Sequence, residues 1–113
     1  MKKIEAIIRP ERVNDVKQAL EAQGIHGMNV IPVTGRGAQR GIVHQGRGGE
    51  ELVVDMLPKV KLELVVPDSV VESTIDAIVA SAQTDNIGDG KIFVIPVEQA
   101  IRVRTNERGD IAL

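Results

Sequence analysis

The sequence predicts a fold of the α+β class, and three observations support this prediction. Residues 2–9 and 59–66 alternate apolar and polar side chains with the period of a half-buried strand. Residues 11–24 and 69–82 place their apolar side chains at helical spacing instead. Ile, Val and Leu dominate the apolar set and Phe93 is the only aromatic residue, which favours a β-rich or α/β core.

The first part of the chain predicts a strand followed by a helix. The strand covers residues 2–9, and Pro10 ends it. A helix follows from Glu11, and Gly24 is placed to close it as a C-terminal cap. The strand face expected in the core carries Ile4, Ala6 and Ile8.

A second strand is expected over residues 28–34 and a third over 59–66. In the third strand one face is expected under the helices, and it carries Val60, Leu62, Leu64 and Val66. The opposite face carries Lys59, Lys61, Glu63 and Val65.

The last third predicts a second helix and a fourth strand. Ser69 to Glu72 has the pattern of a capping box that opens the helix. Its apolar stripe is expected to carry Val71, Ile75, Ile78, Val79 and Ala82. A polar loop covers residues 84–90, and the fourth strand covers 91–95 before Pro96. Beyond it, Arg102 and Arg104 would share one face if their segment is extended.

The element order is therefore βαββαβ, which is the ferredoxin-like arrangement, within a single domain of residues 1–113. This arrangement covers one face of the sheet with helices and leaves the other bare. Because the bare face carries Ile7 and Val65, we expect another copy of the same chain to bury it.

A long segment separates the second and third strands. Six glycines fall between Gly35 and Gly49, so residues of about 36–55 are expected to form a mobile loop without a helix or an inner strand, with regular strand pattern returning after about Asp55. Arg36, Gln39 and Arg40 provide a basic, hydrogen-bonding anchor at its root.

The composition excludes several classes of function. The net charge of -2 and the single aromatic residue argue against a nucleic-acid surface. Without cysteine and with only two histidines, His26 and His44, the chain offers no nucleophile and base pair and no three-ligand metal cluster. No run of apolar residues is long enough for a membrane span or a leader, so we expect a cytoplasmic protein that meets a membrane only through a partner.

Three segments carry weak signals of an anion site, and the glycine-containing stretch of residues 35–41 is one of them. Gly88, Asp89 and Gly90 could bring backbone amides close to phosphate, and Lys91 adds a charge. An ordinary tight turn explains this segment equally well. Arg102 and Arg104 could clamp phosphate oxygens, although such a pair is more often a solvated edge. Neither the P-loop pattern nor the dinucleotide fingerprint is present.

Motifs along nearly the whole chain resemble one family, the PII nitrogen-regulatory signal-transduction proteins. The stretch TDNIGDGKIFV, residues 84–94, is similar to the C-terminal signature of that family at every position. The other similar stretches are residues 1–10, 24–28, 35–41, 57–63 and 101–105.

The resemblance implies a non-enzymatic homotrimer with clefts between subunits, each binding ATP or ADP, with 2-oxoglutarate beside Mg²⁺ and ATP. The implied 2-oxoglutarate residues are Gln39 and Lys59, and Gln39 also reaches the metal. The implied nucleotide residues are Gly35, Gly37, Gln39, Glu63, Val65, Thr84, Gly88, Asp89, Gly90, Lys91, Arg102 and Arg104.

The resemblance further implies regulation of a nitrogen-metabolism partner, first of all an ammonium transporter, through the long loop with Arg47 near its tip. A nitrogenase-regulating relative and, from another class, a small acylphosphatase-like enzyme are the alternatives. Two departures stand out. Ala38 replaces an arginine common in the family, and the loop is one residue longer and has no tyrosine.

Overall fold

The structure is a computed structural model that describes residues 1–36, 42–45, 51–54 and 56–113. Predictions for Gly37, Ala38, Gln39, Arg40 and Arg47 lie outside the described residues.

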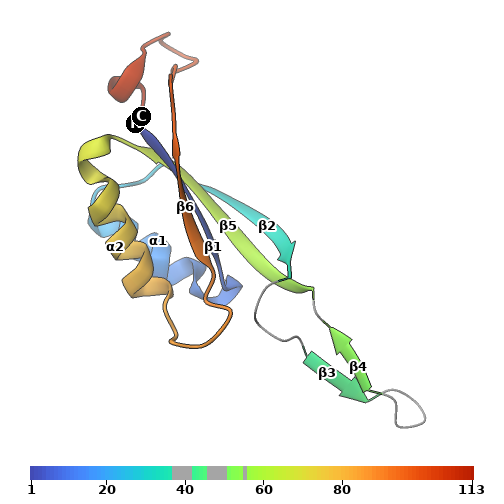
Figure 1. The fold of residues 1–113 in the computed structure, drawn as a ribbon. Coiled ribbons are helices and arrows are strands. Elements are labelled where there is room, and N and C mark those ends of the chain that lie inside the picture. Colours follow the sequence, from blue (N-terminus) through green and yellow to red (C-terminus); the bar gives the residue numbers. More distant parts are fainter. Residues whose placement is uncertain (37–41, 46–50, 55) are drawn as a thin grey trace.

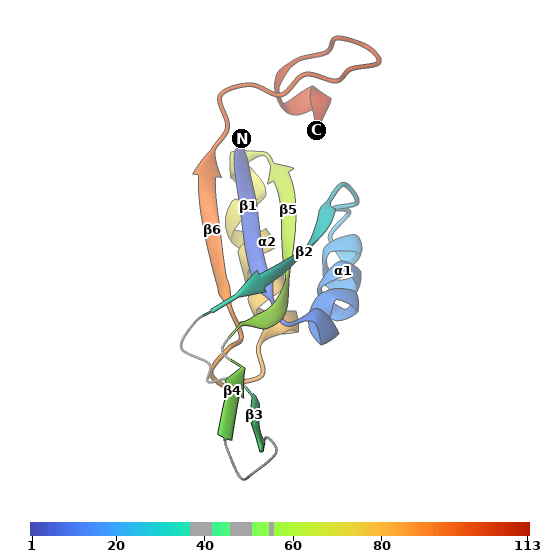
Figure 2. The same ribbon diagram turned by 90° about the vertical axis from the view of Figure 1, so that its right-hand side faces the viewer.

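One four-stranded antiparallel sheet organises the fold, in the strand order β2-β5-β1-β6 (Figures 1 and 2). Its strands are β1 (Lys2–Ile8), β2 (Asn29–Gly35), β5 (Leu57–Val66) and β6 (Lys91–Pro96). Helices α1 (Val13–Ala22) and α2 (Val71–Ala82) lie side by side against one face, each preceded by a 3-10 turn, Pro10–Arg12 and Asp68–Val70. The predicted α+β class is confirmed, and the four-stranded antiparallel sheet with two helices is consistent with the predicted ferredoxin-like arrangement.

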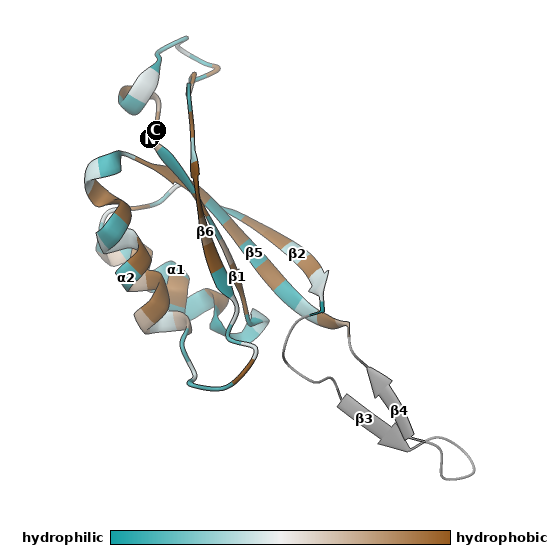
Figure 3. Ribbon diagram, viewed as in Figure 1, coloured by the Kyte–Doolittle hydropathy of each residue, from teal (hydrophilic) through white to brown (hydrophobic). Residues whose placement is uncertain are grey.

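The core lies between this sheet and the two helices, as the alternation of apolar and polar side chains along the strands predicted. Ile4 pairs with Leu64 and Ala6 with Leu62, so the apolar side chains of neighbouring strands share one face. These residues are at most 3% exposed. Figure 3 shows how apolar residues recur along the large sheet and along α2. The stripe predicted for α2 is wrong at Val79, which is 45% exposed, while Thr74 is fully buried and donates to the Val70 carbonyl at 2.7 Å.

The two helix ends differ in how well the sequence predicted them. Gly24 adopts a φ of 78°, its N–H bonds the Glu21 carbonyl at 2.9 Å, and the N–H of Ile25 bonds the Leu20 carbonyl at 3.0 Å. This pair of bonds is a Schellman motif, so the predicted cap is confirmed. The capping box at Ser69 is wrong, because the first turn is 3-10 and no side chain caps α2.

The long loop contains a second sheet. Strand β3 (Ile42–Gln45) pairs with β4 (Glu51–Val54) as an antiparallel hairpin beyond the end of the large sheet (Figure 1). The expectation that strand structure would not return before about Asp55 is therefore wrong. Short β-branched runs on both sides of a glycine-rich stretch could pair with each other without joining the main sheet.

The segment after β6 folds back on itself instead of extending. Ile101 bridges to Arg108, and the N–H of Asn106 bonds the Arg102 carbonyl at 2.8 Å. Arg102 and Arg104 therefore do not sit at alternate positions of a strand, because a turn covers residues 103–105. A last 3-10 turn covers Gly109–Ala112. In the described part of the chain, no helix is long and apolar enough to cross a membrane.

Candidate ligand-binding site

A cavity of about 460 Å³ lies at one end of the sheet face that the helices leave uncovered. The strand register places Gly35 opposite Leu57 and Ile7 opposite Lys91, so all four strands of the large sheet contribute to the floor. The loop between α2 and β6 forms the wall. The lining residues are Ile7, Gly35, Arg36, Leu57, Lys59, Asn86, Gly88, Asp89, Gly90, Lys91 and Phe93.

Asp89 organises the wall of the cavity. Its carboxylate accepts hydrogen bonds from the N–H of Thr84 at 2.7 Å, from the N–H of Asp85 at 3.0 Å and from the Thr84 hydroxyl. These bonds close residues 84–89 into a compact turn in which Asp85 takes a φ of 66°. Together with the bond from Arg9, they lower the pKa of Asp89 well below its ordinary value, because each one favours the charged carboxylate.

Arg9 holds the same turn from the end of β1. Its Nε donates to Asp89 Oδ1 at 3.0 Å, and one terminal nitrogen donates to the Ile87 carbonyl at 2.8 Å. The Arg9 side chain is 15% exposed, so this ion pair is shielded from water and is worth more than a surface pair. The sequence analysis did not name Arg9 as a site residue.

Lys59 holds the turn from β5. Its Nζ donates to the Gly88 carbonyl at 2.6 Å. Burial lowers the pKa of Lys59, and the nearby Arg9 charge lowers it further. Arg9 and Lys59 are therefore fixed at the wall of the cavity, and Arg36 and Lys91 are further cationic residues in its lining.

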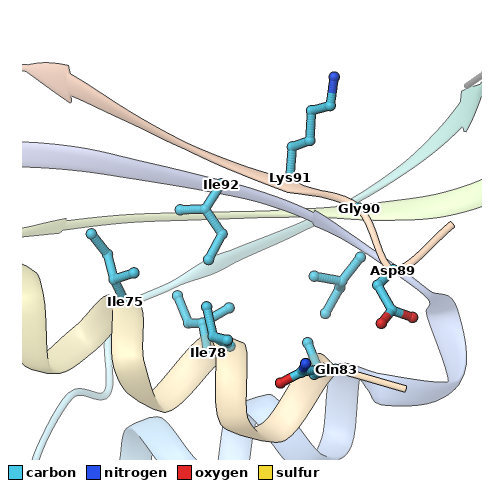
Figure 4. A pocket seen from close by; sticks show the side chains of 10 residues that line it. Ile75, Ile78, Gln83, Asp89, Gly90, Lys91 and Ile92 are labelled. Carbon is cyan, nitrogen blue, oxygen red and sulfur yellow. The ribbon is translucent and has the colours of Figure 1, made fainter. Parts of the chain in front are cut away.

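A second cavity of about 400 Å³ lies on the other side of the Asp89–Lys91 segment, between α2 and the edge of β6. Figure 4 shows apolar side chains gathered there, including Ile75, Ile78 and Ile92, while the Lys91 side chain points away from them. Lys91 is the one cationic residue among the described residues that line this cavity, and its side chain points away from it, so we take the uncovered sheet face as the candidate site.

The predicted site residues fall into two groups. The cavity gathers Gly35, Lys59, Gly88, Asp89, Gly90 and Lys91 at its walls, with Thr84 attached through Asp89. Glu63 and Val65 lie on the same sheet face farther along β5. Arg102 and Arg104 lie beyond the opposite end of β6 (Figure 1). One copy of the described chain therefore does not bring the two groups together.

Several lining residues were missed as site residues. Ile7 was already expected on the bare face, because it alternates with the core residue Ile8. That alternation could have indicated Ile7 as a residue of the site. Leu57, Asn86 and Phe93 join only through strand register and the fold of the loop.

Comparison with known proteins shows the family of this chain. The model of the family "Nitrogen regulatory protein P-II" matches residues 1–107. The chain belongs to this family. A nitrogen regulatory protein P-II of Rhodobacter capsulatus is 55% identical over 113 residues, which is the full length of both chains. Nitrogen regulatory protein P-II 1 of Escherichia coli is 52% identical over the full length of both, and P-II 2 of Methanothermobacter thermautotrophicus is 52% identical over 97% of its length. These relatives are regulatory proteins by name, so the chain belongs to a signalling family and not to a class of enzymes.

Proposed function

We propose that this P-II protein binds ATP or ADP at the cavity on the uncovered sheet face. The observation that carries the proposal is the wall of the cavity, where a glycine-containing turn stands beside Lys59 and Lys91. Cations and close backbone approach are what a nucleotide phosphate chain requires. The apolar part of the floor, with Ile7, Leu57 and Phe93, suits a nucleobase.

The nucleotide would lie between two copies of the chain. Arg102 and Arg104 are too far along the molecule to reach the cavity of their own copy, because β6 alone spans on the order of 20 Å. Glu63 and Val65 lie farther along β5 and are not among the residues that line this cavity. A neighbouring copy packed on the uncovered face could supply them. We therefore propose a homotrimer in which each cleft takes one group of residues from each of two neighbours.

Magnesium fits this site as a partner of the phosphates. In the described part of the chain, no group of three or more His, Asp or Glu side chains could hold a metal. Asp89 is occupied by the bonds of its own turn. Mg²⁺ keeps few protein ligands when phosphates hold it, so the Gln39 amide oxygen suffices from the protein side. The bound metal would supply charge that neutralises phosphate and 2-oxoglutarate together.

The proposed signal is the simultaneous binding of nucleotide and 2-oxoglutarate. Gln39 and Lys59 would bind the 2-oxoglutarate. Lys59 is the third residue of β5, the strand that follows the long loop. A ligand at Lys59 would therefore act at the root of residues 36–55 and change the partner-binding loop, with Arg47 as its contact. The proposed partner is an ammonium transporter or another protein of nitrogen metabolism in the cytoplasm.

Calorimetric titration with ATP tests the proposal. Lys91→Ala and Arg102→Ala should each weaken ATP binding by about 1.5 to 3 kcal/mol, the range of a charge-assisted hydrogen bond. Lys17→Ala, on the exposed side of α1, is the control and should bind as the parent does. Unchanged affinity in both site variants would refute the proposed site.

A further inference from the structure

Two cations hold the peptide planes on both sides of Gly88. Arg9 donates to the Ile87 carbonyl, which belongs to the plane before the Gly88 Cα, at 2.8 Å. Lys59 donates to the Gly88 carbonyl, which belongs to the plane after it, at 2.6 Å. These contacts join residues that are 78 and 29 positions apart in the sequence.

The conformation held in this way is one that a free glycine would leave easily. Gly88 has a φ of 102°, and glycine without restraint populates positive and negative φ about equally. The peptide bonds are trans, so the Gly88 N–H points away from the Ile87 carbonyl and from Arg9. Arg9 and Lys59 together therefore set the direction of an amide donor in the wall of the cavity.

We propose that Arg9 and Lys59 are positioning residues for the nucleotide, acting through the backbone of Gly88. This inference rests on the proposed nucleotide site and deepens it. Before a ligand arrives, the two cations have already ordered the turn, so the phosphates do not have to order it. Lys59 thus has a part in binding ATP even when no 2-oxoglutarate is present.

The test measures ATP affinity without 2-oxoglutarate, together with the amide ¹⁵N and ¹H shifts of the free protein. Arg9→Met and Lys59→Met should each weaken ATP binding about tenfold. The Gly88 amide signal should move in both variants, whereas that of Gly24, in a distant turn, should stay. Lys59→Arg should restore most of the affinity, because a guanidinium can also donate to the carbonyl. Arg12→Met, which removes only an exposed pair with Asp15, is the control.

Salt separates positioning from simple attraction of charge. A missing cation that acts through space matters less at high salt, because exposed charges are screened. A misplaced amide donor weakens ATP binding equally at low and at high salt concentration. The loss of ATP affinity in Arg9→Met should therefore be the same at both salt concentrations. If Arg9→Met does not fold, Lys59→Met decides alone.

Two outcomes would overturn the inference. In the first, Lys91→Ala weakens ATP binding while Arg9→Met and Lys59→Met bind as the parent does, which leaves the nucleotide site standing and removes the positioning role. In the second, the losses disappear at high salt and the Gly88 signal does not move. If the parent protein does not bind ATP at all, the proposed function fails as well.

Discussion

Gly90 lies so close to the carbonyl oxygen of Ile7 that a Cβ added to Gly90 would stand 1.7 Å from it. The contact brings the end of the loop between α2 and β6 against the backbone of β1. Gly90 also has a φ of 104°, a region that side chains disfavour. The position therefore requires glycine for two separate reasons.

Gly90→Ala should destabilise the protein by about 2 to 4 kcal/mol, because the added Cβ both clashes with the Ile7 backbone and strains the positive φ. Gly24→Ala is the matched control. Gly24 has a φ of 78° but no atom within 4 Å of an added Cβ, so only the strain of about 1 kcal/mol is expected. Urea unfolding of both variants at equal protein concentration measures the difference. Equal losses would show that the contact with Ile7 yields easily.

The turn that Asp89 organises should respond to acid. Hydrogen bonds lower the folded-state pKa of Asp89 below its ordinary 3.8, so the turn is stabilised above about pH 4. That stabilisation should be lost progressively as the pH falls toward the lower folded value. The amide signal of Thr84 reports the protonation of Asp89 in the folded protein, because this N–H donates to the Asp89 carboxylate. In Asp89→Asn the signal should already be displaced at neutral pH. A Thr84 signal that moves with a midpoint at or above pH 3.8 in the parent protein would contradict the lowered pKa of Asp89.

The sequence predicted which face each strand residue occupies, because alternation reports a face wherever a core covers it. Ile4, Ala6 and Ile8 are buried, and Lys59 lies on the uncovered face. The same alternation could not reveal that Arg9 contacts Asp89, since 80 residues separate them. Only the sheet register brings the end of β1 to the start of β6.

The sequence analysis also failed to predict the hairpin in the long loop and the fold of the C-terminal segment. Glycine content indicated that residues 36–55 would not enter the main sheet, and this is so for the described residues. It carried no information on whether Ile42–Gln45 would pair locally with Glu51–Val54. At the C-terminal end, the hydrogen bonds of Arg102 with Glu107 and with the Ile111 carbonyl favour a turn over an extended strand.

The uncovered sheet face should be buried between copies of the chain. Ile95 lies on this face opposite Lys3 and is 37% exposed in a single copy. Ile95→Asp should convert a trimer to smaller species, because an unpaired carboxylate in an interface costs several kcal/mol. Val79→Asp changes a similarly exposed residue in the helical layer and should leave the assembly intact. Sedimentation velocity measures both, and a parent protein that sediments as a monomer with full ATP affinity would refute the shared site.

Binding of 2-oxoglutarate should require ATP and Mg²⁺. Lys59 is one cation and already donates to Gly88, so it cannot balance a dianion without the metal. The coupling between the two ligands should be about 1 to 3 kcal/mol, as is typical for linked sites. Calorimetry of 2-oxoglutarate in the presence of ATP with magnesium, and then of ADP, measures it. Equal affinity with ADP, or in Gln39→Ala, would exclude the proposed route.

The long loop should not be switched by covalent modification of a hydroxyl group. From Gly35 to Lys59 the sequence contains no Ser, Thr or Tyr, and the whole chain has no tyrosine. Uridylylation of a tyrosine and phosphorylation of a serine both need such an acceptor on an accessible segment. Regulation at the loop would then depend on which ligands are bound, with Arg47 as the side chain that reaches a partner's pore or pocket. Intact-mass analysis of protein from nitrogen-starved and ammonium-shocked cells should give the same unmodified mass, whereas a stoichiometric nucleotidyl or phosphoryl adduct between residues 35 and 59 would overturn the prediction.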